Sequence, residues 1–497
     1  MKARPTRRSV PLLAALVALA AAPARAGEAA APPPPAAPPP AWTPAPPPPP
    51  AARAVPVAPP ARELVLANGR RIVAVEHHAR PLVLVTLVLP RGALSDPPDA
   101  AGATSLAIDI ATDFHEVGPR GEELVEERSL RRQLAERGGL LRAGSGHDAS
   151  WLSVDGFAGD LPVYLDLLAT ALREPRHGSQ SYKGRRDARL DFLEDLRASD
   201  GAALEKVMAE AAFGPGHPYA RPGIGTHAGL LRMGLEDVVR HQEALLVPEG
   251  ATLLVVGDVS AGAALAQART AFQSWKGRAL PAPEAPPAPA ARGGMGLLRR
   301  QPAATLVTCA TRALGGVAAS DAALELLAAL LGEGPRSRLA IALRDEGGHA
   351  YSVGAALERR RHGRAFLACS PLAAGRAGEG LAAFRATLAA ARAAPPTEAD
   401  LAHARGLVLG RLDAGWDDAE RISDAWSSAL LLGEDRPRPE RQRAALEAVT
   451  PAELWRVARE VLRPEALRWV VSGEPRVAEW AAKVNGLGAP VVLTLER

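Results

Sequence analysis

The segment "LVTLVLPRGALSDPPDAAGATSLAIDIAT", residues 84–112, has a counterpart later in the chain, "TLVTCATRALGGVAASDAALELLAALLGEG" at residues 305–334. Each consists of a β-rich apolar run, a turn of small residues that contains an Asp, and a helix-forming segment. A helix followed by a strand then closes each half, in residues 235–259 and 451–475. Because both matches recur in the same order at a similar offset, the sequence predicts a duplicated unit.

Strands and helices intermingle without a strict βαβ rhythm, so we expect an α+β fold in which each half is a pair of layers. Residues 27–60 are almost entirely Ala and Pro, which predicts an extended tether in the polyproline conformation. The tether is interpreted as a spacer, and a docking ligand for a Pro-binding partner is the alternative. A second Pro-rich segment, 279–294, is the predicted linker between an N-terminal domain, 61–278, and a C-terminal domain, 295–497.

The first 26 residues are typical of a secretory signal peptide. Basic residues precede the apolar run "VPLLAALVALAAAP", and "ARA" predicts cleavage after Ala26. The run is shorter than the ~20 apolar residues that span a bilayer, so we expect no membrane span in the mature chain. Removing five basic residues leaves 54 Lys and Arg against 55 Asp and Glu, a net charge of −1. This balance argues against nucleic acid as a partner.

The exported chain keeps two cysteines, Cys309 and Cys369. They are too few for a Cys-rich metal site. An oxidising compartment permits a disulfide, but sequence alone does not place the two within bridging distance. A disulfide and two buried thiols therefore both stay open.

Three segments in a fixed order resemble the pitrilysin/insulinase family of zinc metallopeptidases, which includes the mitochondrial processing peptidase and the core proteins of cytochrome bc1. They are "LANGRRIVAVEHHARPLVLVTLVLPRGALSDPPDAAG" (66–102), "FGPGHPYARPGIGTHAGLLRMGLEDVVRHQEALLVPEGATLLVVGDV" (213–259) and "GPRSRLAIALRDEGGHAYSVGAA" (334–356). The resemblance covers residues 62–497. It implies two homologous α/β-sandwich domains that form half of a clamshell, so a complete chamber needs a second chain.

The zinc motif of active family members is H-x-x-E-H on a helix. Its two His side chains point the same way and bind Zn²⁺, its Glu activates the bound water, and a distant Glu is the third ligand. In "AGATSLAIDIAT" (101–112), Ser105 and Asp109 replace the two His, and Ile108 replaces the Glu. The resemblance therefore implies that this chain holds no zinc and that the degenerate helix is kept for packing.

None of the eleven His residues completes a displaced zinc motif. Glu194 and Asp195, near the expected third ligand, are predicted to be solvated helix charges. His217 belongs to an "HPY" turn, where we expect it to cap the backbone or pack, and His147 is a weaker candidate for lining a cleft.

Arg344 and Tyr351 lie seven residues apart, across a helix end and the Gly347–Gly348 turn. An Arg can hold a substrate carbonyl or carboxylate, and a Tyr hydroxyl can donate to the oxyanion of a tetrahedral intermediate. The alternative is a solvated Arg at a helix end and a packed Tyr at a strand start. In pitrilysin-type peptidases, an Arg and a Tyr with this spacing reach toward the substrate at the zinc. This chain departs from the family wording at His349, which takes the place of an apolar residue and receives no role.

Some bacterial family members divide the site between two chains, one with the zinc motif and one with the Arg/Tyr pair, and this sequence resembles the second kind. We expect a non-catalytic, substrate-binding subunit of an exported heterodimeric zinc peptidase in the periplasm, inactive alone. The expected partner carries H-x-x-E-H and the zinc, and the substrate is a peptide or unfolded protein. The alternative is a scaffold protein of core-protein type with no part in proteolysis.

Overall fold

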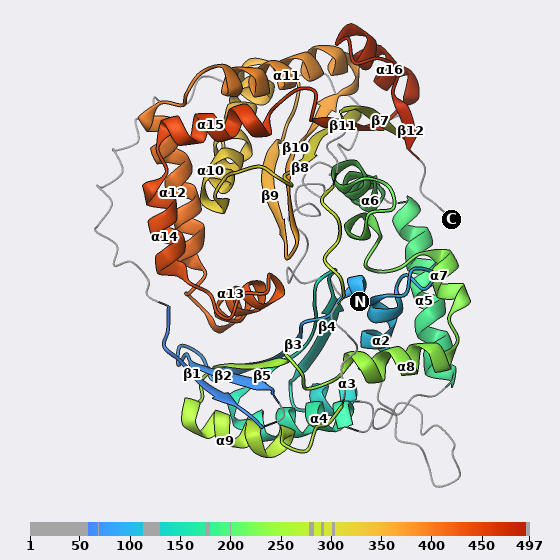
Figure 1. The fold of residues 1–497 in the computed structure, drawn as a ribbon, viewed down its shortest axis with the longest axis vertical. Coiled ribbons are helices and arrows are strands. Elements are labelled where there is room, and N and C mark those ends of the chain that lie inside the picture. Colours follow the sequence, from blue (N-terminus) through green and yellow to red (C-terminus); the bar gives the residue numbers. More distant parts are fainter. Residues whose placement is uncertain are drawn as a thin grey trace, which may run out of the picture.

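The computed structural model describes residues 58–67, 69–112, 130–173, 179–198, 200–277, 283–289, 293–300 and 304–493. The predicted signal peptide and most of the predicted tether lie outside the described residues. The described chain forms two units, each built on a six-stranded sheet (Figure 1).

The N-terminal unit alternates strands with helices. Its strands are β1 (Ala61–Val65), β2 (Arg71–Glu76), β3 (Leu82–Leu89), β4 (Leu140–Ser145), β5 (Ser150–Phe157) and β6 (Thr252–Gly257). Its helices are α2 (Ala103–Ala111), α3 (Leu130–Ala135), α4 (Leu161–Arg173), α5 (Ser179–Ala198), α6 (Asp200–Phe213), α7 (His227–Arg232), α8 (Leu235–Leu245) and α9 (Ala261–Phe272).

The C-terminal unit begins at Gly294, so the last residue of the predicted linker already belongs to a strand. Its strands are β7 (Gly294–Arg299), β8 (Thr305–Ala313), β9 (Gly354–Arg360), β10 (Gly363–Ala373), β11 (Arg468–Gly473) and β12 (Val491–Leu493). Its helices are α10 (Asp321–Gly332), α11 (Ala377–Ala393), α12 (Glu398–Ala414), α13 (Ala419–Leu431), α14 (Pro439–Ala448), α15 (Pro451–Val461) and α16 (Pro475–Val484), with a π-helical segment, Ala340–Glu346.

The strand orders confirm the predicted duplication and the α+β class. The N-terminal sheet runs β1-β2-β6-β3-β5-β4, and the C-terminal sheet runs β12-β7-β11-β8-β10-β9. Each sheet has one corresponding parallel pair, β2/β6 in the N-terminal sheet and β7/β11 in the C-terminal sheet. The three strand pairs that follow this pair in each strand order are antiparallel. The sixth strand differs: β1 is antiparallel to β2, whereas β12 comes from the chain's end and is parallel to β7.

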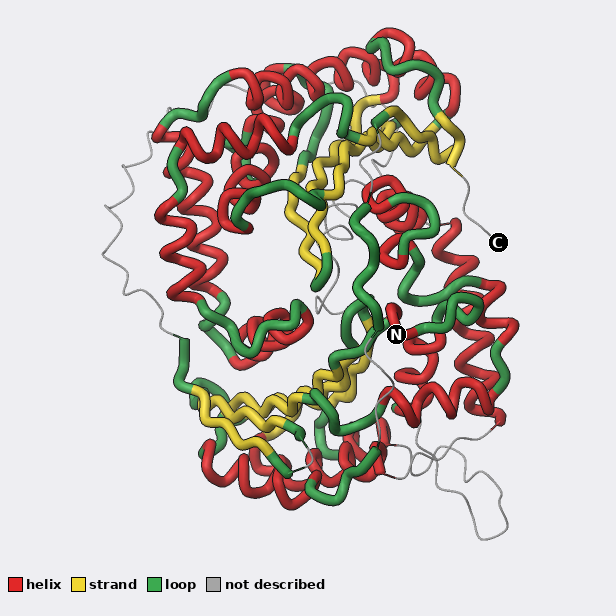
Figure 2. The backbone as a smooth tube through the Cα atoms, viewed as in Figure 1, coloured by secondary structure: helices red, strands yellow, loops and turns green. Residues whose placement is uncertain are grey.

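Each sheet is covered on one face by helices of its own unit and on the other by a helix of the opposite unit (Figures 1 and 2). Helix α13 contacts β3 and β6, while α6 contacts β8 and β11. Trp416, Ile422 and Trp426 pack with apolar side chains of β2, β3 and β6. Because helices cover both faces of β3, this strand, "LVLVTLVL", is apolar at every position except Thr86.

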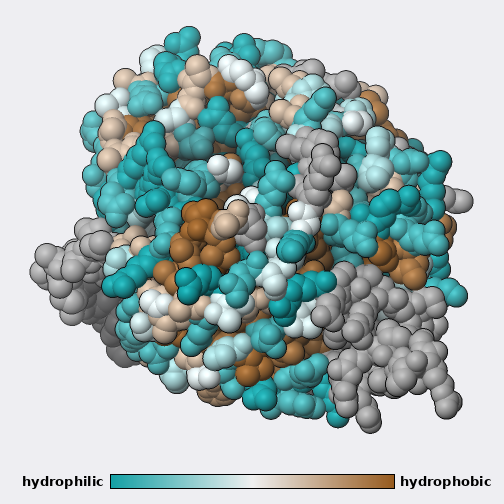
Figure 3. All heavy atoms as spheres, turned by 60° about the horizontal axis from the view of Figure 1, so that its bottom comes forward, coloured by the Kyte–Doolittle hydropathy of each residue, from teal (hydrophilic) through white to brown (hydrophobic). Residues whose placement is uncertain are grey.

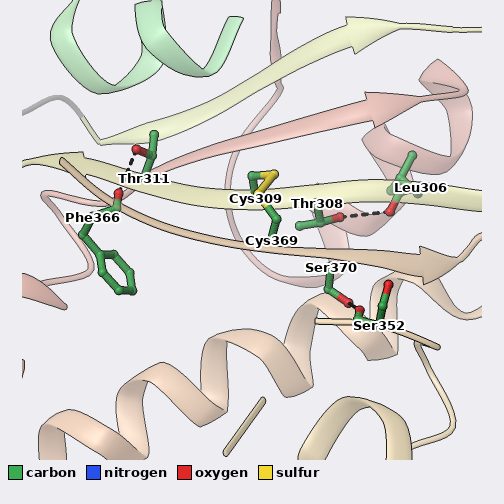
Figure 4. Close-up of a disulfide and its surroundings, with 8 residues drawn as sticks. All are labelled: Leu306, Thr308, Cys309, Thr311, Ser352, Phe366, Cys369 and Ser370. Carbon is green, nitrogen blue, oxygen red and sulfur yellow. Dashed lines mark hydrogen bonds between the residues drawn. A yellow bond between two sulfur atoms is a disulfide. The ribbon is translucent and has the colours of Figure 1, made fainter. Parts of the chain in front are cut away.

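Cys309 and Cys369 form a disulfide beneath α6, which decides between the two alternatives left by the sequence (Figure 4). They lie directly opposite each other on β8 and β10, with their Cα atoms 4.1 Å apart. In the same pair of strands, the Thr311 hydroxyl donates to the Phe366 carbonyl at 2.9 Å. The centre of the C-terminal sheet is therefore both cross-linked and hydrogen-bonded through side chains.

On the face of the molecule drawn in Figure 3, hydrophilic residues predominate and hydrophobic residues gather in separate patches. Among the described residues, no helix is long and apolar enough to cross a bilayer.

Candidate functional site

The turn before α2 fixes the position of the degenerate zinc helix. Asp96 accepts hydrogen bonds from the backbone N–H groups of Gly102 and Thr104, both at 2.7 Å. It therefore satisfies N–H groups that have no partner within the first helical turn. Gly102 has a φ of 100°, and a Cβ there would lie 2.7 Å from the Gly225 Cα. The small residues and the Asp of this turn thus let α2 begin against the 222–226 loop.

On α2, Ser105 and Asp109 face α5, and Arg189 of α5 joins them. One terminal nitrogen of Arg189 (Nη1) donates to Ser105 Oγ, and the other (Nη2) forms an ion pair with Asp109 Oδ2. Nη1 also approaches the Ile224 carbonyl at 3.4 Å. Ile108, in the place of the catalytic Glu, is fully buried in the N-terminal core. Helix α2 therefore packs into the core through residues such as Ile108, while Ser105 and Asp109 bind the side chain of Arg189.

These residues do not fit the zinc that active members of the resembled family bind. A catalytic zinc takes three protein ligands such as two His and a Glu. Here the helix offers one hydroxyl and one carboxylate, and the carboxylate already pairs with Arg189. Glu194 and Asp195 are exposed on α5. Over the described ranges, no three His, Cys, Asp or Glu side chains are grouped so that they could hold a metal ion.

The Arg/Tyr pair lies together in the C-terminal unit. Arg344 is in the last turn of the π-helical segment, and Gly348, with a φ of 56°, turns the chain toward Tyr351. Both side chains line a cavity of about 240 Å³ whose other lining residues are Gly334, Pro335, Ala340, Ser352 and Val353. Tyr351 is 91% exposed, so it is not the packed Tyr of the structural alternative.

Asp345 orients the Arg344 guanidinium. Arg344 Nε donates to Asp345 Oδ1 at 2.7 Å, and Nη2 donates to Asp345 Oδ2 at 3.2 Å and to the Pro335 carbonyl at 3.4 Å. The hydrogen bond to Asp345 raises the pKa of Arg344, and the same bond lowers the pKa of Asp345. The pair is accordingly ionised and solvent-facing. His349 is buried, and its backbone N–H donates to the Leu343 carbonyl at 2.7 Å, so it stabilises the turn.

Solved structures share this fold. An M16 peptidase inactive domain from Pseudomonas fluorescens has a TM-score of 0.73 at 18% identity, and covers 84% of this chain and 98% of its own. A protease from Helicobacter pylori has a TM-score of 0.73 at 17% identity, covering 83% and 99%. A chain of complex III from Candida albicans has a TM-score of 0.70 at 13% identity, covering 87% and 100%.

Sequence comparison adds the family. Residues 232–407 match the family described as the peptidase M16 inactive domain. An uncharacterised zinc protease of Mycobacterium tuberculosis is 28% identical over 340 residues, which are 65% of this chain and 75% of that protein. One of Mycobacterium leprae is 29% identical over 285 residues, covering 54% and 60%. Residues 232–407 therefore match an M16 peptidase family, and the fold of most of the chain is that of M16 peptidases. The matched family is that of the inactive domain, which supports a non-catalytic member.

His147 lies at the contact between the two units. Its Nδ1 accepts from Arg360 Nη1 at 2.7 Å, and its Nε2 donates to the Arg221 carbonyl at 2.8 Å. His217 caps the turn foreseen for it, because its Nδ1 accepts from the Tyr219 N–H at 3.1 Å. Both His side chains therefore have structural partners.

Arg189 is the site residue that was not predicted from the sequence. It directly precedes the segment in which the third zinc ligand was sought, residues 190–200. The available signal was chemical: two small polar groups one helical turn apart, Ser105 and Asp109, are suited to a basic partner. The search for a third metal ligand considered only the carboxylates Glu194 and Asp195, and so it passed over Arg189.

Proposed function

We propose that the protein is the non-catalytic, substrate-binding subunit of an exported heterodimeric zinc peptidase of pitrilysin type. The observation that carries the proposal is the contrast between the two units. The N-terminal unit holds Arg189 where a zinc site is expected, whereas the C-terminal unit presents Arg344 and Tyr351 together at a cavity. A chain that had lost all part in peptide hydrolysis would have no need of the second arrangement.

Arg344 and Tyr351 have the chemistry to act on a peptide bound at a partner's zinc. The guanidinium, oriented by Asp345, donates charge-assisted hydrogen bonds to a peptide carbonyl or carboxylate. The Tyr351 hydroxyl donates to the oxyanion that develops when water attacks the scissile carbonyl. The exposure of Tyr351, 91%, suits a side chain whose binding partner is another molecule.

The partner is a homologous chain that carries H-x-x-E-H and the zinc, and the substrate is a peptide or unfolded protein. We place the pair in the periplasm because residues 1–26 read as a signal peptide. The Cys309–Cys369 disulfide supports an oxidising compartment.

A scaffold function is the second candidate, and the likeness to a chain of complex III from Candida albicans favours it. In that case the clamshell half is only an interaction surface. It predicts a stable complex without peptide cleavage, and tolerance of substitutions at Arg344 and Tyr351.

Native purification of the tagged mature chain, with mass spectrometry of the proteins that accompany it, tests the proposal. We expect a roughly equimolar second chain that carries H-x-x-E-H, and peptidase activity that needs both chains. Recovery of the chain alone, or only with envelope proteins that lack the motif, would favour the scaffold.

A further inference from the structure

We infer that Arg189 is a fixed internal cation at the lost zinc site, so that metal binding here is blocked by a guanidinium as well as by the missing ligands. The inference concerns the N-terminal unit alone and holds whether or not the proposed function is right. It rests on three contacts: Arg189 with the Ser105 hydroxyl, the Asp109 carboxylate and the Ile224 carbonyl.

The Arg189 side chain is buried enough to stay in place at the degenerate zinc positions. Its side chain is 10% exposed, and the side chain of Asp109 is 31% exposed. A guanidinium stays protonated at every physiological pH and donates from a rigid planar fork. It therefore supplies the positive charge between α2 and α5 that a metal ion would otherwise supply. It also neutralises Asp109, the only carboxylate of α2.

Helix geometry explains why α5 delivers this group and not a carboxylate. Tyr182, Arg186, Arg189 and Leu193 recur at helical spacing and form the less exposed face of α5, whereas Glu194 and Asp195 are exposed. Among the described side chains of α5, Arg189 is thus the ionisable one that reaches both Ser105 and Asp109. A divalent ion at the same place would stand beside a positive charge that cannot leave by deprotonation.

The test restores the ligands on α2 with and without the arginine. The S105H/I108E/D109H variant is compared with the same variant that also carries R189E, which supplies a carboxylate from α5. Zinc per chain is measured after dialysis, and cobalt(II) absorption reports the ligand set. We expect far less than one zinc per chain in the first variant and about one in the second.

Two results would overturn the inference. Equal zinc binding by both variants would mean that Arg189 is no barrier, and no binding by either folded variant would mean that Arg189 does not occupy the ligand position. Circular dichroism checks the folding of each.

A second measurement keeps the inference testable if the restored variants do not fold. R189Q, D109N and the double variant are compared by thermal unfolding. Because one ion pair links the two residues, the double variant should unfold at nearly the same temperature as R189Q. Additive decreases would show that Arg189 is not held by Asp109 and would contradict the inference.

Discussion

His147 and Arg360 form a hydrogen bond that joins the two domains, with 2.7 Å between Nδ1 and Nη1. Since Arg360 can only donate, His147 Nδ1 is the acceptor and the ring proton is on Nε2. Burial, together with the charge of Arg360, lowers the pKa of His147 to about 3. The imidazole therefore stays neutral in the folded protein well below the pH at which a free His becomes protonated.

The first prediction is a loss of stability in mild acid. The unfolded chain binds a proton at His147 below pH 6.5, whereas the folded chain does not until about pH 3. Stability conferred by the neutral ring is thus complete above pH 6.5 and is lost as the pH falls toward 3. Between pH 6.5 and 5 this amounts to about 2 kcal/mol. Urea denaturation at a series of pH values measures it.

H147Q is the matched control, because an amide offers one donor and one acceptor without titrating. Burial also lowers the pKa of His241, so part of the acid dependence persists in any His147 variant. The difference between wild type and H147Q isolates the contribution of His147. Parallel stability curves for the two proteins would contradict the assignment.

The second prediction concerns the proposed heterodimer with a zinc-bearing partner. Y351F should lower kcat about 10²-fold, because it removes one donor to the oxyanion. Its free energy of unfolding should be unchanged, since the side chain is 91% exposed. R344A should lower kcat/KM of the pair through loss of charge-assisted bonds to the substrate.

Steady-state kinetics on purified pairs measures both effects. R132A is the control, because Arg132 is an exposed arginine of the N-terminal domain that pairs with Glu136. We expect no change from it. Full turnover by Y351F and R344A pairs would remove the two residues from the reaction and leave the scaffold function.

The third prediction is that the disulfide carries a large share of the stability of the C-terminal domain. Cys309 and Cys369 close a loop with a sequence separation of 60. Such a cross-link restricts the unfolded chain by about 4 kcal/mol. C309A/C369A, or wild type under a strong reductant, should unfold at a correspondingly lower urea concentration. Identical midpoints with and without reductant would show that the bond does not form.

The fourth prediction is that a substitution in one domain weakens the other. Trp426 of α13 is nearly buried against the N-terminal sheet, so W426A should cost about 3 kcal/mol. Amide hydrogen exchange should rise in β3 and β6, more than 160 positions away along the chain. W480A, which removes a Trp that is 43% exposed, should cost less and leave those strands protected. Faster exchange confined to the C-terminal domain would argue against the coupling.

Sequence reasoning reached the fold because the decisive patterns are local. The apolar run of β3, the Asp-containing turn and α2 are contiguous, and their recurrence in β8 and α10 exposed the duplication. The sequence did not predict that α6 covers the C-terminal sheet and that α13 covers the N-terminal sheet. A run such as "TLVTCATRA" in β8 shows that both faces are buried, but it does not name the helix that buries them.

The candidate site, too, could be predicted from the sequence only in part. Helical spacing predicted that Ser105 and Asp109 share one face of α2, and the family resemblance marked these two and Ile108 as the positions of the zinc motif. Arg189 could not be found so directly, since its contact with Asp109 spans 80 positions and depends on how α5 packs against α2. The family resemblance, with the spacing of Arg344 and Tyr351, indicated a pair, whereas the cavity that both side chains line depends on how the Gly334–Pro335 turn packs beside them.

Because α13 covers the sheet of the other unit, the N-terminal domain cannot complete its packing during biosynthesis until α13 has been made. The inner face of β2, β3 and β6 has its cover only after residues 419–431 have left the ribosome or the translocon. Until then the N-terminal sheet presents an apolar surface that a holdase chaperone would recognise. Maturation of the first domain therefore waits for the last quarter of the chain, and a truncated product should be recognised as incomplete by quality-control proteases.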